Sequence, residues 1–277
     1  MKRCSQPELR NKASSAFNRL YCEELMPSAT VSVCIITYNE EKNIRACLES
    51  VRWADEIIVV DSFSNDATVS ICSEYTHNVM QRSWPGHVEQ KNFAIDQATG
   101  DWILGLDADE RVSPELAEEI KAVLAGHDQG ADGFSFPRHS FYLGRWINHG
   151  GWYPDAKIRL FKRGLARWGG KNPHDKVILG GKVGYLHGEL RHYVYRNISH
   201  QLQTVDSFSS ITADGFFSEG KRFNLGYLVF RPCFKFLETY VWRRGFLDGL
   251  PGFVIAVISS YYVFLKYAKL WEKEKGL

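Results

Sequence analysis

Two carboxylates separated by one residue, Asp107 and Asp109, follow a short apolar run that begins at Trp102. Such a run is typical of a buried strand, which delivers its last residues to the edge of a sheet. Carboxylates spaced two apart at that edge can converge on one divalent cation, in a geometry that suits a nucleoside diphosphate. An isolated Asp-x-Asp pair is more often a solvated loop feature, so this pair needs support from the rest of the chain.

Two earlier apolar runs also end in polar residues. The run 30–37 stops at Tyr38-Asn39-Glu40-Glu41, and the run 56–60 stops at a polar stretch that extends from Asp61 to Asp66. We therefore expect three strands to finish at one edge of one sheet within the first 110 positions.

Helical patterns separate these strands. Asn39 is a plausible N-cap for a helix whose apolar positions extend from Ile44 to Val51, and a shorter helix should follow Asp66. A third helix is expected at about 87–98, and a fourth begins with Ser113 as its cap and Pro114 at its first position. This alternation predicts an α/β fold with a mainly parallel sheet, helices on both faces, and ligands at the carboxyl ends of the strands.

Four segments resemble, in order, the motifs of family 2 glycosyltransferases of the GT-A fold, which is Rossmann-like. They lie at 36–41, 60–68, 90–92 and 106–110. The segments 151–154, 158–161 and 174–175, together with the basic aromatic C-terminus, resemble the branch that contains bacterial lipopolysaccharide-core glucosyltransferases. The resemblance implies an inverting transfer of glucose or a related hexose from a UDP-sugar to a lipid-linked saccharide such as the lipopolysaccharide inner core.

The resemblance also implies roles for individual residues. Asp109 would bind Mg²⁺ or Mn²⁺, with Asp107 supporting it or contacting the ribose. The residues alone also offer His192 as a candidate metal ligand, although a core or surface histidine is the more common case. The nucleotide-sugar would be held by Thr37, Asn39, Glu40, Asp61, Lys91 and Asp107. For the base that takes the proton of the attacking hydroxyl we favour Asp175. His174 is the alternative, because the unperturbed pKa of histidine suits neutral pH.

Length and composition are compatible with one large domain plus an appendage, since the chain has 277 residues and is 44% hydrophobic. We expect an N-terminal extension at 1–30, a GT-A domain at 31–220 and a tail at 221–277. Within the domain, 31–112 would bind the nucleotide-sugar and 113–220 the acceptor. The extension has no apolar core of a signal peptide, and the cysteines at 34, 47 and 72 fall on core faces, which favours a reducing, cytoplasmic compartment.

The tail combines positive charge with aromatic residues. It holds ten Lys or Arg and four Asp or Glu, a net charge of +6, and an uncharged run of 17 residues from Gly249 to Leu265. That run is short for a spanning helix, so we expect an amphipathic helix on an anionic membrane, at the cytoplasmic face of a bacterial inner membrane, peripheral or monotopic. A pair of core helices in a soluble domain is the alternative. No recognised nucleic-acid motif accompanies the charge.

Other function classes share part of this pattern. A phosphohydrolase could use Asp107 as nucleophile and Asp109 as acid, although that architecture would place the pair near the start of the domain. A family 2 transferase for another cell-envelope glycan or a polyprenyl-linked acceptor, and a non-catalytic nucleotide-sugar-binding protein, also fit. Release of UDP that depends on metal, measured with and without acceptor, separates these classes.

Overall fold

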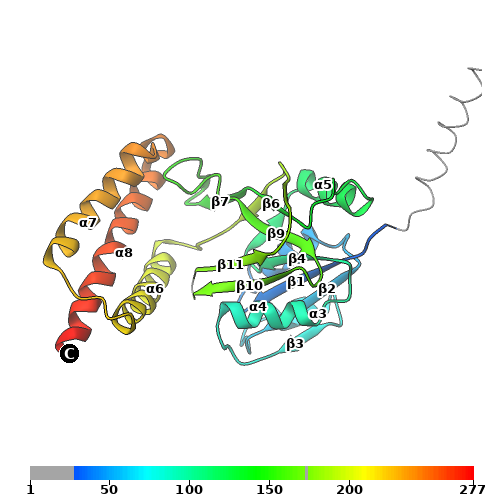
Figure 1. The fold of residues 1–277 in the computed structure, drawn as a ribbon, viewed down its shortest axis with the longest axis horizontal. Coiled ribbons are helices and arrows are strands. Elements are labelled where there is room, and N and C mark those ends of the chain that lie inside the picture. The colour runs from blue at the N-terminus through cyan, green and yellow to red at the C-terminus, as the bar shows by residue number, and fades with distance from the viewer. Residues whose placement is uncertain (1–27, 172–173) are drawn as a thin grey trace, which may run out of the picture.

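The centre of the molecule is a seven-stranded sheet in the order β12-β6-β9-β4-β1-β2-β3 (Figure 1). The structure, a computed structural model, describes residues 28–171 and 174–277, without the side chains of Lys171 and His174. Strands β3, β2, β1 and β4 are parallel, and β9 lies antiparallel to both β4 and β6. The strands are β1 Val31–Thr37, β2 Glu56–Asp61, β3 Val79–Gln81, β4 Trp102–Asp107, β6 Gly133–Phe136, β9 Lys157–Lys162 and β12 Val183–Tyr185.

Helices cover both faces of this sheet, as the alternation of residues in β1 requires. Val33 and Ile35 pack toward α2 and α5, whereas Cys34 and Ile36 pack toward α4. The expected α/β fold with a mainly parallel sheet and helices on both faces is therefore confirmed. These helices are α2 Ile44–Ser50, α3 Thr68–Ser73, α4 His87–Asp96 and α5 Pro114–Leu124.

Two smaller β-structures carry the second half of the domain. A hairpin of β10 (Ala166–Lys171) and β11 (His174–Leu179) packs over α4. A four-stranded sheet has the order β5-β13-β7-β8. Its strands are β5 Glu110–Val112, β7 Arg138–Tyr142, β8 Arg145–Trp146 and β13 Leu190–His192.

Local structure differs from expectation at two places. Asn39 does not cap α2: it has a positive φ of 53°, and the N-cap is Asn43. The segment 138–152 is rich in Gly, His and aromatic residues and has no regular period in the sequence, which favours an irregular binding loop, but it contains β7 and β8, and Phe141 pairs with Trp146 across these two short strands.

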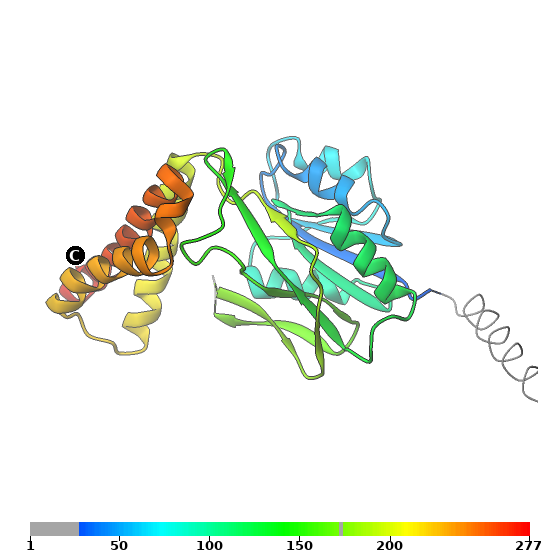
Figure 2. The same cartoon turned by 90° about the horizontal axis from the view of Figure 1, so that it is seen from above.

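Three helices lie together to one side of the sheets (Figures 1 and 2). They are α6 (Ile198–Ser218), α7 (Leu225–Leu237) and α8 (Gly249–Lys275), and a π-helical turn, η1 (Glu238–Trp242), and a 3₁₀ turn, η2 (Gly245–Asp248), connect α7 to α8. Both α6 and α7 pack against α8. The expected domain boundary at residue 220 falls between α6 and α7, whereas packing groups all three as one helical unit.

A buried carboxylate joins this helical unit to the small sheet. The Asp248 side chain is fully buried and accepts backbone N–H groups of Asn148 at 3.2 Å and His149 at 2.8 Å. Gly150 adds a backbone hydrogen bond to the carbonyl oxygen of Arg243 at 2.8 Å. Because a buried carboxylate needs such donors, the segment after β8 is held against the start of α8.

The helical unit exposes much apolar surface. No residue of α7 is buried, and Phe230 and Leu250 are each 73% exposed. Within the described residues one helical stretch, Gly245–Lys275, is long and apolar enough to cross a membrane, and an 18-residue window within it has a mean hydropathy of 1.5. Pro251 lies in the first turn of α8, where a missing N–H is tolerated, so the helix is continuous.

Candidate active site

The candidate site lies at the carboxyl ends of β1, β2 and β4. Thr37 is the register partner of Asp61, and Ile36 is the register partner of Asp107, so the three polar strand ends expected from the sequence meet at one edge. The hydroxyl oxygen of Thr37 is buried there without a hydrogen-bond partner among the described residues. A buried polar atom without a partner is unusual and is commonly satisfied by a ligand or water.

The turn after β2 is built around Asp61. Its fully buried carboxylate accepts the backbone N–H of Ser64 at 2.8 Å and the side-chain amide of Gln81 at 3.3 Å. Asn39 holds the same turn, because its side-chain oxygen accepts the N–H of Asn65 at 2.9 Å. The positive φ of Asn39, which asparagine adopts more readily than most residues, points its side chain into this turn.

Lys91 connects the strand ends to the β10-β11 hairpin. Its ammonium lies 2.8 Å from Asp107 Oδ1, 2.9 Å from Asp175 Oδ2 and 4.3 Å from the centre of the Trp168 ring. Only 6% of the side chain is exposed, so Lys91 is not an ordinary surface lysine of α4. Asp175, separated from Lys91 by 84 residues in the chain, is thereby brought to the edge where β4 ends. The side chain of the alternative base, His174, lies outside the described residues.

Asp107 has a second cationic partner that the sequence analysis missed. Arg159 Nη2 lies 3.0 Å from Asp107 Oδ2 and 2.9 Å from Glu110 Oε1, and Arg138 is 3.3 Å from the same Glu110 oxygen. Burial would raise the pKa of the Asp107 carboxyl, but Lys91 and Arg159 hold it well below its usual range. A charged residue between the apolar residues Ile158 and Leu160 in the middle of β9 was the signal that could have identified Arg159.

Asp109 faces a histidine from the small sheet. His192 Nε2 lies 3.4 Å from Asp109 Oδ2, and the other ring nitrogen, Nδ1, lies 3.2 Å from the Ser140 hydroxyl. Glu110, His192 and Ser140 are register partners across β5, β13 and β7, so strand pairing fixes this arrangement. Burial raises the pKa of the Glu40 carboxyl, and the nearby Asp109 carboxylate raises it further.

The donor chemistry of this region fits a divalent cation in part. A carboxylate and an imidazole are both divalent-metal ligands, and a Ser140 hydroxyl on Nδ1 can hold the tautomer that leaves Nε2 free to ligate. Asp107, by contrast, has both oxygens in ion pairs. Across residues 28–171 and 174–277, no three His, Cys, Asp or Glu side chains form a metal-binding cluster. The chain would thus supply two ligands, Asp109 and His192, and a bound diphosphate the others.

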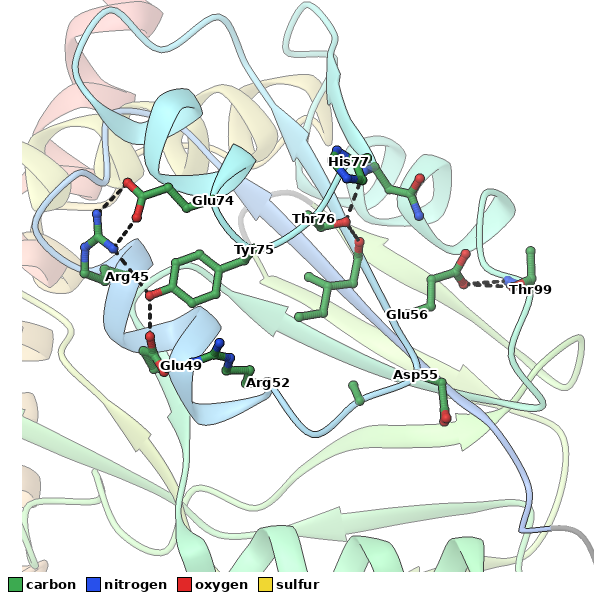
Figure 3. Close-up of a pocket in the computed structure, with 13 residues that line it drawn as sticks. Arg45, Glu49, Arg52, Asp55, Glu56, Glu74, Tyr75, Thr76, His77 and Thr99 are labelled. Carbon is green, nitrogen blue, oxygen red and sulfur yellow. Dashed lines mark hydrogen bonds and ion pairs between the residues drawn. The ribbon is translucent and has the colours of Figure 1, made fainter.

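The large polar groove drawn in Figure 3 lies elsewhere, at the opposite ends of the strands. It encloses about 790 Å³ between α2, α3 and the start of β2. Several of its polar side chains are already paired, since Arg45 forms an ion pair with Glu74 at 2.6 Å and the Tyr75 hydroxyl donates a hydrogen bond to Glu49. The groove holds none of the site residues expected from the sequence.

Known proteins resemble this chain over most of its length. The family model Glycosyl transferase family 2 matches residues 32–186. The lipopolysaccharide core biosynthesis glycosyltransferase LpsC of Rhizobium meliloti (strain 1021) is 30% identical over 90% of this chain and 94% of that protein. An uncharacterized glycosyltransferase of Rickettsia typhi is 33% identical over 87% of each chain. Among solved structures, the mannosyltransferase PcManGT from Pyrobaculum calidifontis, in complex with GDP-Man and Mn²⁺, superposes with a TM-score of 0.54 at 15% identity and covers 94% of this chain and 95% of that one.

Proposed function

Because this chain belongs to glycosyltransferase family 2, we propose that it transfers glucose or a related hexose from a UDP-sugar to a lipid-linked saccharide, with inversion at the anomeric carbon. Lipopolysaccharide inner core is the proposed acceptor, and the 30% identical lipopolysaccharide core glycosyltransferase supports it. The observation that carries the proposal is the Lys91 bridge, which joins Asp107 at the end of β4 to Asp175.

Asp175 is the proposed base. It would accept the proton of the acceptor hydroxyl while that oxygen forms the new bond to the anomeric carbon and the bond to the UDP oxygen breaks. Attack from the face opposite the diphosphate inverts the anomeric configuration. The ion pair with Lys91 fixes the position of the Asp175 carboxyl group beside the strand ends, where a base would have to lie. Mutating Asp175 and His174 separately distinguishes these two candidate bases.

Asp109 and His192 are the proposed ligands of Mg²⁺ or Mn²⁺. The cation would neutralise the charge that develops on the departing diphosphate. Both carboxylate oxygens of Asp107 form ion pairs, one with Lys91 and one with Arg159. The proposed role of Asp107 is therefore to position these two cationic side chains at the edge where the diphosphate would bind.

The turn built by Asn39 and Asp61 is the proposed uridine site. Thr37 offers a buried hydroxyl without a partner in the described structure, and Glu40 lies at the same edge near Asp109. In this proposal Asp61 contributes mainly by shaping the turn through Ser64, because its oxygens already accept hydrogen bonds there.

The helical unit is the proposed membrane attachment at the cytoplasmic face of the inner membrane, peripheral or monotopic. Three features support binding to an anionic membrane surface. They are the exposed apolar side chains of α7, the apolar stretch within Gly245–Lys275, and the net charge of +6 in 221–277. The cysteines at 34, 47 and 72 are buried and free, as expected in a reducing compartment.

Release of UDP from a panel of nucleotide sugars tests the proposal. We expect release from one UDP-hexose, stimulated by lipid-linked inner-core saccharide and abolished by EDTA. Stimulation only by polyprenyl-linked or other cell-envelope acceptors would change the acceptor class. Tight UDP-sugar binding without release would identify a non-catalytic binding protein.

A further inference from the structure

The outward face of the small sheet carries a row of basic side chains. Arg191 on β13 is the register partner of Arg111 on β5 and of His139 on β7. Register partners project from the same face, so the three side chains stand side by side across three strands. Like charges directly opposite one another are unfavourable in a sheet, and the cost falls when an anion lies between them.

These basic groups have little protein compensation. Among the described residues, the guanidinium groups of Arg111 and Arg191 have no ion pair or hydrogen bond, although Glu115 at the start of α5 interacts electrostatically with Arg191. In the described part of the chain, Arg111 Nε and His139 Nε2 are buried and have no hydrogen-bond partner. Glu189 contacts the other ring nitrogen of His139, Nδ1, at 3.1 Å. Unpaired groups of this kind call for an explanation in a folded protein.

Aromatic rings surround the same row. Phe141, Trp146 and Tyr193 contact one another with ring centroids 5.2–5.8 Å apart, and all three are partly exposed. The His139 ring packs 4.9 Å from Trp146, and the Arg111 guanidinium lies 3.7 Å above the Tyr193 ring. Rigid rings with a few convergent polar groups are typical of small-molecule sites, and ring faces can pack against the apolar face of a sugar.

This face adjoins the proposed cation site without being part of it. The Tyr193 N–H donates to the carbonyl oxygen of Asp109 at 2.9 Å, and Arg111 follows Asp109 by two residues. His192, the residue between Arg191 and Tyr193, projects from the opposite face toward Asp109. A ligand on the outward face would therefore lie beside the reacting groups and not on them.

We propose that this basic aromatic face, formed by Arg111, Arg191, His139, Phe141, Trp146 and Tyr193, binds an anionic part of the acceptor saccharide, a carboxylate or phosphate on a sugar next to the one that is glycosylated. Guanidinium groups suit both anions because their N–H groups match two oxygens at once. The proposal rests on the proposed transferase function and adds to it the charge of the acceptor.

The test uses the full chain with saturating UDP, so that the nucleotide site cannot take up the probes. Glucose 6-phosphate, glucuronate and glucose are titrated by calorimetry into the wild type and into Arg111→Gln, Arg191→Gln and Arg111→Lys. Arg52→Gln, an exposed arginine near the opposite ends of the strands, is the matched control. Affinity for UDP is measured in every variant as a check of folding and of the nucleotide site.

We expect one or both anionic sugars to bind at least 10-fold more tightly than glucose, and whichever binds identifies phosphate or carboxylate as the preferred group. Each Gln variant should lose about 10-fold, a typical effect of removing one charged hydrogen bond, and the Lys variant should recover only part of it. Equal affinity for all three sugars, or an equal loss in Arg52→Gln, overturns the proposal. Failure of UDP to bind the wild type would instead count against the proposed function.

Discussion

Lys91 Nζ lies 2.9 Å from Asp175 Oδ2 while its second carboxylate partner, Asp107, belongs to the strand end that carries the Asp-x-Asp pair. One buried ammonium thus holds a residue of the β10-β11 hairpin against the central sheet. Only 12% of the Asp175 side chain is exposed, so Lys91 gives this largely buried carboxyl group an ion-pair partner.

If Asp175 is the base, Asp175→Asn should lower kcat about 10²–10⁴-fold, the usual effect of losing a general base. UDP affinity should change little, because the amide still fits beside Lys91. Single-turnover transfer and UDP binding measure the two effects. His174→Gln is the control, and a larger loss in that variant than in Asp175→Asn would transfer the role to His174.

The cation proposal predicts linked losses at Asp109 and His192. Asp109→Ala or His192→Ala should weaken Mn²⁺ binding to the UDP-loaded protein about 10–100-fold and abolish transfer, because each removes one of two protein ligands. Electron paramagnetic resonance of Mn²⁺ measures binding independently of activity. Asp214→Asn, an exposed carboxylate of α6, should behave as wild type. Full activity of the wild type in EDTA would contradict the metal assignment.

The lowered pKa of Asp107 predicts a specific pH dependence of stability. Its native pKa lies below the unfolded value of about 3.9, so its ion pairs stabilise the fold fully above that pH and lose their effect as pH falls further. Asp107→Asn should therefore cost about 1–3 kcal/mol at pH 7, and the difference from wild type should shrink toward pH 3. Urea unfolding at pH 7, 5 and 3 measures it. A difference that is constant with pH would exclude this charge effect.

Membrane attachment through exposed apolar side chains predicts that Phe230→Glu combined with Leu250→Glu weakens binding to liposomes containing anionic lipid at least 10-fold. Each wild-type side chain is 73% exposed, and burying one in lipid contributes about 1.5–3 kcal/mol. Flotation of the full chain measures binding; truncation is unsuitable because Asp248 joins the helical unit to the segment after β8, and because α6 packs against α8. Leu165→Glu, at an exposed leucine in the turn before β10, should not change flotation. Wild-type protein that fails to float at low salt would refute the membrane proposal.

The sequence alone determined the strand and helix alternation, the two-faced core and the edge at which three polar strand ends meet. These features follow from local periodicity, since alternating apolar residues in β1 can be buried only if layers cover both faces. The sequence did not determine the N-cap of α2. Asparagine is a common N-cap residue, but the side-chain oxygen of Asn39 accepts the N–H of Asn65 in the neighbouring turn instead.

The tertiary structure decided which charges meet. Asp107 is 52 residues from Arg159, and Lys91 is 84 residues from Asp175; strand pairing of β4 with β9 and packing of the hairpin on α4 create these contacts. A local pattern reports which positions are buried, but it carries no information about the partner that compensates a buried charge. That partner is set by strand order and register, which is why Arg159 was missed and why the row from Arg111 to His139 becomes visible only when β5, β13 and β7 are aligned.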